Sequence, residues 1–325
     1  MHIPVLQKEV IEYLLPEPNE NFIDCTIGGG GHTAAILKNN GPEGKVLGIE
    51  WDSELYEKLQ AAKIKNQKSK IKNRLVLVND NFANLKNIIE KYNFGPVHGI
   101  LIDLGISSWH FEESKRGFSF QRDETLDMRL NPEVQEVSAK DILNSRSELE
   151  IEKILREYGE EMFARKIARN IVEQRKIEPI STTFQLLKII KMAVPAWYCH
   201  QKINFATRTF QALRIAVNSE LENLRRVLPQ ALDILEPDGR LVVISFHSLE
   251  DRIAKFFFRE KEKEGLINIL TKKTVKPTLE EIKLNPRSRS ARLRAVQKRQ
   301  HAKTSNLPRV LYKFFDNFIS EKISD

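Results

Sequence analysis

The sequence predicts an α/β fold, in which a Rossmann-like parallel sheet carries an inserted helical domain. Three observations lead to this prediction. Short apolar runs alternate with helix-like segments in the first third of the chain. A turn of four consecutive glycines separates the first apolar run from the first helix-like segment. Residues 104–239 then separate the fourth apolar run from the fifth, which is far longer than an ordinary strand-to-strand crossover.

The expected strands and helices follow from the lengths of these runs. Apolar runs at 21–26, 45–50, 74–79 and 97–103 predict strands, and the segments 31–39, 53–65 and 82–93 predict the helices between them. Strands of this length that alternate with helices form a parallel sheet covered on both faces. After a predicted turn at 236–239, the run at 240–246 predicts a fifth strand. A helix at 249–263 and strands at 267–273 and 290–298 complete the expected core.

The long intervening segment has the pattern of folded helices. Between 148 and 177 apolar residues recur at steps of three and four, with Gly159 dividing the stretch into two helices. Ser181, Thr182 or Thr183 is expected to cap a further helix that stops at Pro195. We therefore expect residues 1–110 and 207–303 to form one core, 111–206 an inserted substrate-recognition domain, and 304–325 a C-terminal tail.

Composition narrows the class of protein. Hydrophobic residues make up 41% and charged residues 30% of the 325 residues, which predicts a soluble globular protein, and no apolar run is long enough to span a membrane. Two distant cysteines, Cys25 and Cys199, predict reduced thiols in the cytoplasm and no structural metal site. A net charge of +8 favours a polyanionic partner.

The glycine-rich turn at 24–33, with the sequence DCTIGGGGHT, predicts a ligand site. Glycines between a strand and a helix let the backbone approach a ligand, and the helix N-terminus offers free N–H groups. Gly29, Gly31 and Ala34 also satisfy the loose dinucleotide fingerprint, and Glu50 stands where an acid would bind ribose. Asp24 favours S-adenosylmethionine over NAD, because a carboxylate at this strand end can meet the ammonium group of the methyl donor.

The segment GILIDLGISS at 99–108 predicts a second part of the site, because ligands of open parallel sheets lie beyond the carboxyl ends of the strands. Asp103 ends the fourth strand, and Ser107 or Ser108 follows it. Such acceptors can hold the exocyclic amine of a base so that its lone pair faces a methyl donor. For the two serines, capping of a turn is an equally good explanation.

Ten segments spread over nearly the whole chain have the pattern of one known family. They are HIPVLQKEV (2–10), the glycine turn, NFANL (81–85), GILIDLGISS, RGFSF (116–120), LDMR (126–129), YGEE (158–161), ATRTFQALRIAVNSEL (206–221), ISFHSLEDR (244–252) and NPRSRSARLR (285–294). On these segments the chain resembles the RsmH (MraW) family of bacterial 16S rRNA cytosine-N4 methyltransferases. The chain departs from the usual family pattern at Glu50, at Trp109-His110 and at Asn204-Phe205, where the family usually has Asp, Pro-Gln and His-Pro.

The resemblance implies a class I S-adenosylmethionine methyltransferase that acts on N4 of a cytidine in the decoding centre, by direct transfer from S-adenosyl-L-methionine. The implied partner is 16S rRNA or the small ribosomal subunit, and a homodimer is compatible with the sequence. The residues expected to bind the methyl donor are Gly30, Gly31, His32, Glu50, Phe82 and Asp103. The best candidates for catalysis are Asp103, Ser107 and Ser108.

Basic residues supply the candidates for RNA contacts. Arg208, Arg287 and Arg289 are the expected contacts, whereas Arg116 and Arg129 are as well explained by structural ion pairs. In the alternative interpretation, the arginines of 285–294 pair with acids such as Glu250 or Asp251 and serve the fold. His247 and Glu250 resemble metal ligands, but their H-x-x-E spacing without a second pair favours a turn and helix cap.

Two other functions compete with methyl transfer. A nicotinamide-dependent dehydrogenase would use the same glycine turn and would be stabilised against heat by its own cofactor. An RNA-binding assembly factor without activity would bind small subunits and transfer no methyl group. A Ser-His-Asp hydrolase has no G-x-S-x-G motif in this sequence to support it.

Overall fold

The computed structural model describes residues 4–65 and 72–300. Its seven-stranded sheet has the order β3-β2-β1-β4-β5-β7-β6. Strands β1 (Phe22–Asp24), β2 (Val46–Glu50), β3 (Leu75–Asn79), β4 (Val97–Asp103) and β5 (Leu235–Ser245) are parallel. Strand β7 (Arg292–Lys298) lies antiparallel between β5 and β6 (Ile267–Ile269). The expected Rossmann-like parallel sheet is confirmed, with one antiparallel strand near its edge.

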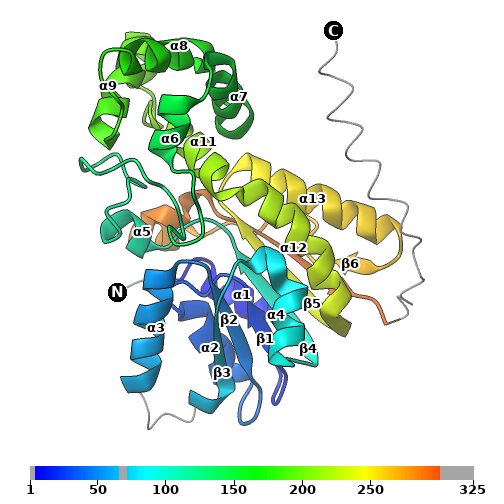
Figure 1. Cartoon of the computed structure of the whole chain (residues 1–325). Coiled ribbons are helices and arrows are strands. Elements are labelled where there is room, and N and C mark those ends of the chain that lie inside the picture. Colours follow the sequence, from blue (N-terminus) through cyan, green and yellow to red (C-terminus); the bar gives the residue numbers. More distant parts are fainter. Residues whose placement is uncertain (1–3, 66–71, 301–325) are drawn as a thin grey trace.

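Helices cover both faces of this sheet, as Figure 1 shows. The short apolar strands alternate side chains between the faces, so each face has its own core. On one face Val46, Leu101 and Val242 pack with α1 (Gln7–Leu14) and α2 (Gly31–Asn39). On the other face Leu47, Ile100 and Val243 pack with α4 (Leu85–Tyr92), α12 (Glu220–Ile234) and α13 (Ser248–Lys263). Helix α3 (Ser53–Lys65) packs on β2 and β3.

Residues 236–239 do not form the separate turn that the sequence predicts before the fifth strand, but belong to that strand. The structure continues β5 back to Leu235, which pairs with Val97, and the register of the two strands then shifts so that Gly99 faces Arg240. Asp238 takes a left-handed conformation with φ of 62°, which accommodates the extra residues as an irregularity inside the strand. Strand β6 is also shorter than the expected 267–273.

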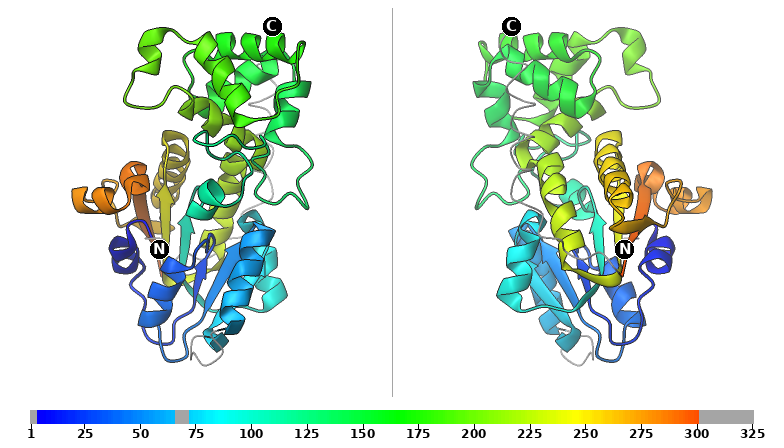
Figure 2. Two further views of the ribbon diagram at one scale, coloured as in Figure 1. Left: turned by 90° about the vertical axis from the view of Figure 1, so that its left-hand side faces the viewer. Right: turned by 90° about the vertical axis from the view of Figure 1, so that its right-hand side faces the viewer.

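Residues 108–218, between β4 and α12, form a helical lobe above the carboxyl edge of the sheet, drawn from teal through green to yellow-green in Figures 1 and 2. Its helices are α5 (Ser108–Glu112), α6 (Ala139–Ser145), α7 (Glu148–Gly159), α8 (Ala164–Arg175), α9 (Thr183–Ala193), α10 (Ala196–Cys199) and α11 (Thr207–Asn218). Helix α7 ends at Gly159 and Thr182 caps α9, as the sequence predicts. These helices bury a hydrophobic cluster of their own, with Leu155, Ile167, Ile190 and Leu213 at its centre.

The sheet places a ligand site where its strand order reverses. Strands β2 and β3 extend to one side of β1, whereas β4 and β5 extend to the other, so the β1–β4 boundary is the switch point at which open parallel sheets bind ligands. The chain crosses into the helical lobe from the end of β4, which puts the lobe beside this position (Figure 1). The predicted tail at 304–325 lies outside the described residues. Within the part that is described, no helix combines the length and apolar character needed to cross a membrane.

Candidate active site

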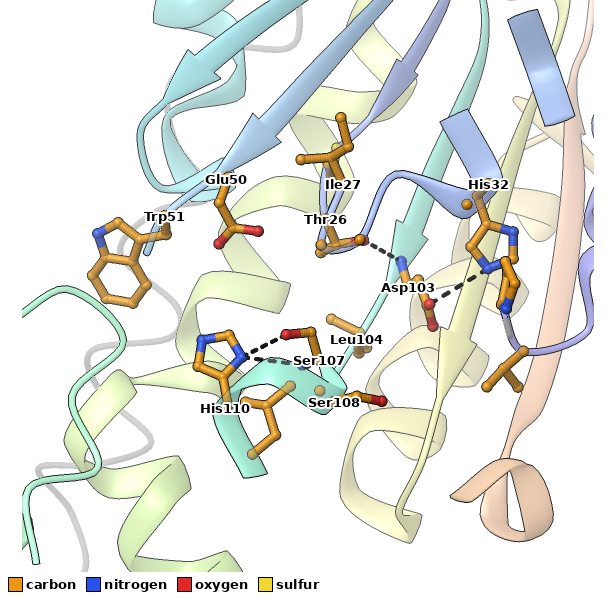
Figure 3. Close-up of a pocket in the computed structure, with 18 of the residues that line it drawn as sticks. Thr26, Ile27, His32, Glu50, Trp51, Asp103, Leu104, Ser107, Ser108 and His110 are labelled. Atoms are coloured by element: carbon orange, nitrogen blue, oxygen red, sulfur yellow. Dashed lines mark hydrogen bonds and ion pairs between the residues drawn. The ribbon is translucent and has the colours of Figure 1, made fainter. Parts of the chain in front are cut away.

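A pocket lies at the switch point and is lined by the ends of β1, β2 and β4 and by the loops that follow them (Figure 3). Five of the six residues expected to bind the methyl donor line it, namely Gly31, His32, Glu50, Phe82 and Asp103. Ser107 and Ser108 line it as well. Residues from three separate strand ends therefore meet in one cavity, as the strand-end argument predicts.

The glycine turn shapes one wall of this pocket. Gly28 and Gly30 have φ of 49° and 76°, in the left-handed region that side chains disfavour. Gly31 begins α2, and a Cβ there would lie 2.2 Å from the Pro4 ring. Gly30 lies outside the pocket lining and occupies the N-cap of α2. Its contribution is therefore to the backbone conformation of the turn.

Asp24 does not face the pocket, and its expected role toward an ammonium group is wrong. The side chain is only 1% exposed and accepts a hydrogen bond from the Thr33 hydroxyl at 2.7 Å and one from the Thr26 backbone N–H at 3.2 Å. Burial raises the pKa of this carboxyl. Asp24 therefore ties the glycine turn to α2.

Asp103 is the acid that faces the pocket on this side. Its backbone N–H donates to the Thr26 hydroxyl at 2.8 Å, which joins the end of β4 to the glycine turn. Its Oδ2 lies 3.5 Å from Nε2 of the buried His32. Oδ1 is also buried, and among the described residues it has no hydrogen-bond partner, as is true of both ring nitrogens of His32. Because unpaired buried polar atoms are costly, this pair is arranged for a ligand that completes it.

His32 and Asp103 also influence each other electrically. Burial opposes a charge on His32, but the neighbouring Asp103 carboxyl outweighs that effect and raises the pKa of the imidazole. The glycine turn thus places a histidine of increased basicity beside a carboxylate at the carboxyl edge of β4. Together they form a polar corner suited to a ligand that carries both an ammonium and a carboxylate group.

Glu50 forms the opposite polar corner, at the end of β2. Its Oε1 accepts a hydrogen bond from the Asp52 backbone N–H at 2.9 Å. Burial raises the pKa of the carboxyl to about 8, although backbone N–H groups around it lower that value. Figure 3 shows the carboxyl facing the cavity between Trp51 and Thr26, a position from which it can accept hydrogen bonds from two adjacent hydroxyls.

The raised pKa of Glu50 predicts a pH dependence of stability. A carboxyl whose pKa rises from 4.5 to about 8 on folding stabilises the fold while it is protonated, and this contribution is lost as pH rises through that interval. Glu50→Gln keeps the neutral shape at every pH. Without donor, the melting temperature of the variant should therefore exceed that of the wild type by a margin that grows from the acid to the alkaline end of the interval. A margin independent of pH would show that the carboxyl titrates normally.

Ser107 is held in a chain of three side chains. Its hydroxyl lies 2.9 Å from Nδ1 of His110, whose Nε2 lies 3.1 Å from Oδ2 of Asp52. Burial lowers the pKa of His110, which favours the neutral ring. Burial alone would raise the pKa of Asp52, but the hydrogen bond and charge of His110 and the charge of Arg116 outweigh this effect, so that the pKa is lowered. Nδ1 accepts from the Ser107 backbone N–H at 3.2 Å, so a neutral ring carries its proton on Nε2, toward Asp52.

This chain fixes the loop that follows β4. Arg116 is buried and donates to Asp52 at 2.7 Å, and it also forms an ion pair with Glu54. Trp109 packs against the ring of His110 with centroids 5.1 Å apart. At the two positions where the chain departs from Pro-Gln, it thus builds a packed network onto the first turn of α3. For Arg116 the structural ion pair is confirmed, and Arg129 pairs likewise with Asp127 at 2.6 Å.

Several pocket residues were absent from the sequence prediction. Asp80 follows β3, and its only sequence signal is the polar run at 79–81 after an apolar strand. Trp51 follows Glu50 directly. Phe246 follows β5, and its aromatic side chain at the end of an apolar run predicts a position in the core. It nevertheless lines the pocket, where its ring lies 3.4 Å from the point that a Cβ on Gly105 would occupy.

The expected RNA-binding arginines are not brought together. Arg208 lies in the helical lobe, where it donates to the Glu160 carbonyl at 2.6 Å. Arg287 lines the pocket, forms an ion pair with Glu112 at 2.9 Å and lies over the Phe111 ring. Arg289 is exposed near the pocket mouth.

The alternative interpretation holds for the next two arginines. Arg292 and Arg294 share one face of β7, and both form ion pairs with Asp251 on α13, at 3.3 and 2.7 Å. Their charges are thus compensated within the fold. The segment 285–294 therefore divides between a loop with two arginines near the pocket and a strand with two arginines in structural pairs.

The turn-and-cap assignment of His247 and Glu250 is confirmed. His247 caps α13, and Glu250 accepts from the backbone N–H of Phe246 at 2.8 Å. With Glu220 they form the group of described side chains whose ligand atoms lie close enough to hold a metal ion. Glu220 already binds Arg214 through both carboxylate oxygens, at 2.8 and 2.9 Å. The expected absence of a metal stays a prediction.

Comparison with known proteins identifies the family of this chain. Residues 1–299 match the MraW methylase family. The chain is 44% identical over 313 residues to "Ribosomal RNA small subunit methyltransferase H" of Heliobacterium mobile, covering 91% of this chain and 98% of that one. Proteins of the same name from Clostridium botulinum (strain Kyoto / Type A2) and Dehalococcoides mccartyi are 43% and 45% identical, again over 91% of this chain and over 98% and 86% of their own. This chain therefore belongs to the MraW methylase family.

Proposed function

We propose that this protein methylates N4 of a cytidine in bacterial 16S rRNA, with S-adenosyl-L-methionine as the donor. The observation that carries the proposal is the meeting of the glycine turn, Glu50 and the His32–Asp103 pair in one pocket of a methylase-family chain. The relatives named above are small-subunit rRNA methyltransferases. The dehydrogenase alternative has no comparable support.

The pocket fits this donor at both ends. S-adenosylmethionine supplies an electrophilic methyl group on a sulfonium, flanked by an amino acid and a ribose. His32 and Oδ2 of Asp103 suit the amino acid end, because together they offer a donor and an acceptor, and Oδ1 of Asp103 remains for the target amine. Glu50 suits the ribose hydroxyls, and Phe82 lines the wall beside it. Gly30 and Gly31 give the backbone its close approach.

The chain also offers the acceptor that an exocyclic amine needs. The lone pair of the amine is delocalised into the base and is therefore a poor nucleophile. A carboxylate that accepts a hydrogen bond from the amine orients the lone pair for attack and stabilises the positive charge that develops on the nitrogen. Asp103 is our first choice for this role, since Oδ1 is buried without a partner among the described residues. The Ser107 hydroxyl already donates to His110, which leaves its oxygen as an acceptor. Ser108, in the first turn of α5, is the third candidate.

Direct transfer needs no nucleophile from the protein. Cys25 lines the pocket wall, but burial raises the pKa of its thiol well above the usual value. A thiol held protonated is a poor nucleophile toward a base. This supports transfer to the amine itself and argues against a covalent adduct with the base ring.

We further propose that residues 111–206 form a substrate-recognition domain inserted between 1–110 and 207–303. The separate hydrophobic cluster of the helical lobe supports an inserted unit, but it includes Phe210 and Leu213 of α11, which argues for an end of this unit after α11 instead of at residue 206. Recognition would use Arg208 from α11 together with Arg287 and Arg289 near the pocket mouth. Action on RNA in the bacterial cytoplasm and the homodimer are part of the same proposal.

Replacing Arg287 and Arg289 together with Gln should weaken RNA binding and flatten its salt dependence. For single-stranded RNA, the slope of log affinity against log salt should fall by roughly 0.7 for each phosphate that the variant no longer neutralises. Titration of labelled RNA at several salt concentrations measures both quantities. Donor affinity should stay the same in Arg289→Gln alone, because Arg289 does not line the donor pocket, whereas Arg287 does.

The matched control is Arg292→Gln with Arg294→Gln, which removes the same charge from the structural pairs with Asp251. That variant should lower the melting temperature while leaving the salt slope nearly unchanged. The opposite pattern, with an unchanged slope for the Arg287 and Arg289 variant, would remove these two residues from the RNA surface.

The function itself is tested by methyl transfer to small ribosomal subunits from cells that lack the enzyme. With isotope-labelled donor, label should enter RNA and become soluble on ribonuclease digestion. Binding of subunits without any transfer would favour the assembly-factor alternative. Label found in ribosomal protein would overturn the RNA substrate.

A further inference from the structure

The donor pocket shares a lining residue with one neighbouring hollow, which in turn shares a lining residue with a second hollow. The first, here named the outer hollow, shares Phe246 with the pocket and is lined by Lys202, Lys276 and Arg289. The second, the α13 hollow, shares Lys276 with the outer hollow. Its other lysines and arginines are Lys255, Arg259, Lys272, Lys273 and Arg294. The surface is thus continuous from the donor pocket to the outer side of α13.

Neither hollow has an acidic side chain in its lining. Asp251 compensates Arg292 and Arg294, which line the two hollows from β7. The remaining cations form no ion pair with an acid of the described residues, and they are Lys202, Lys255, Arg259, Lys272, Lys273, Lys276 and Arg289. Uncompensated cations that line a hollow mark a surface for a polyanion.

The sheet register gives these cations a direction. Strand β7 begins at the carboxyl edge of β5, where Arg292 pairs with Ser245, and runs away from that edge. The segment 270–275, which precedes α14 (Leu279–Leu284), runs antiparallel alongside β7. Val275 pairs with Leu293, and the backbone N–H of Leu270 donates to the Ala295 carbonyl. Lys276 therefore lies at the active-site edge, and Lys272 and Lys273 lie farther from it. Figure 2 shows this orange segment beside α13.

We propose that Arg289, Lys276, Lys272, Lys273, Lys255 and Arg259 form a basic track that binds the phosphates of single-stranded RNA on one side of the methylated nucleotide. This inference rests on the proposed function, because it takes the donor pocket as the destination of the target base. The basic track defines where the strand leaves the pocket: past Phe246, over Lys276 and along α13.

Single-stranded RNA fits the basic track better than a folded acidic protein does. The cations follow a line that begins at the mouth of a catalytic pocket, as expected for a flexible backbone whose target base is turned inward. Phe246 stands between the pocket and the outer hollow, where its ring can stack on a base at the turn of the strand. Lysines and arginines along one groove then neutralise successive phosphates.

The test compares Lys272→Gln with Lys273→Gln against a matched control, Lys86→Gln with Lys91→Gln, which removes the same charge from α4 outside the basic track. Dissociation constants for a short fluorescein-labelled RNA with one cytidine would be measured by anisotropy over a range of salt. The track variant should bind about fivefold more weakly for each phosphate left without its lysine at ~0.1 M salt, with a shallower slope. The control should match the wild type.

Two further probes give the test a direction. One RNA extends only to the 5′ side of the cytidine and the other only to the 3′ side. The proposal predicts that the track variant discriminates between them, because the basic track holds one side of the strand. Equal sensitivity of both probes would overturn the proposal, since it indicates a general loss of positive potential.

The outcomes separate this inference from the proposed function. If wild-type protein methylates subunits and the track variant matches the wild type in RNA affinity and salt slope, the basic track is wrong and the function stands. If RNA binding depends on the basic track but no methyl group is transferred, the proposed function fails, and the track remains a surface that binds RNA without a methylated nucleotide beside it. If the wild type methylates subunits but binds neither probe, the basic track is wrong and the function stands.

Discussion

Asp103→Asn should lower the rate of methyl transfer by about two to three orders of magnitude at saturating donor, without unfolding the protein. The substitution keeps the size of the side chain but removes the negative charge that, in our account, stabilises the positive charge developing on the amine. It also replaces one acceptor by a donor, in a place where Oδ1 has no other partner among the described residues. Single-turnover methyl transfer together with thermal unfolding measures the two effects.

The control for this prediction is Asp80→Asn, which changes another acid of the same pocket away from β4. It should leave the rate at saturating donor within a fewfold of the wild type. Wild-type turnover in Asp103→Asn would place the active centre elsewhere. If the Asp103→Asn variant did not fold, the carboxylate would be required for the stability of the protein and not specifically for methyl transfer.

Glu50→Ala should weaken donor binding by about 1.5–3 kcal/mol, because it leaves the ribose hydroxyls of the bound donor without their hydrogen-bond acceptor. This corresponds to a dissociation constant roughly ten to a hundred times higher. Calorimetric titration of the folded variant with S-adenosylmethionine measures it. Because the carboxylate acts in binding and not at the amine, turnover at saturating donor should fall far less than in Asp103→Asn.

Glu50→Gln separates charge from shape in the same experiment. It should recover part of the affinity, since its amide oxygen still accepts one hydrogen bond. Unchanged affinity in a folded Glu50→Ala variant would show that the donor does not reach the end of β2.

The parts of the site that sequence predicts are those fixed by the ends of regular elements. Glu50 and Asp103 each end an apolar run, and parallel strands bring such ends to one edge. Gly31 begins α2 at the residue expected from the glycine turn. These predictions need only the pattern of apolar residues along the chain and the rule that ligands bind at the carboxyl ends of parallel strands.

The parts that sequence missed depend on contacts between distant segments. The Asp24 side chain is turned away from the pocket, where its carboxyl accepts a hydrogen bond from the Thr33 hydroxyl on α2. The role of His110 follows from Asp52, which arrives from another strand end. Phe246 ends an apolar strand and looks like core, and its exposure to the pocket follows from its place beside Gly105. None of these contacts leaves a periodic signal in the chain.

The strand β5 shows a different limit. Turn-forming residues at 236–239 predict a turn before the fifth strand, yet pairing of Leu235 with Val97 draws the segment into the sheet. Tertiary pairing outweighs local turn preference here, and the register shift is the structural consequence. The error is confined to the far end of the strand and leaves the carboxyl edge, where the pocket lies, as predicted.

The most direct test of the account is the identity of the modified nucleoside. Small subunits from cells that lack the enzyme would be incubated with the protein and isotope-labelled S-adenosylmethionine, and the RNA would be digested to nucleosides and analysed by mass spectrometry. The account predicts label in N4-methylcytidine, because Asp103 presents an acceptor to an exocyclic amine and the Cys25 thiol is held protonated. Label in 5-methylcytidine, or in any nucleoside methylated at carbon, would contradict it.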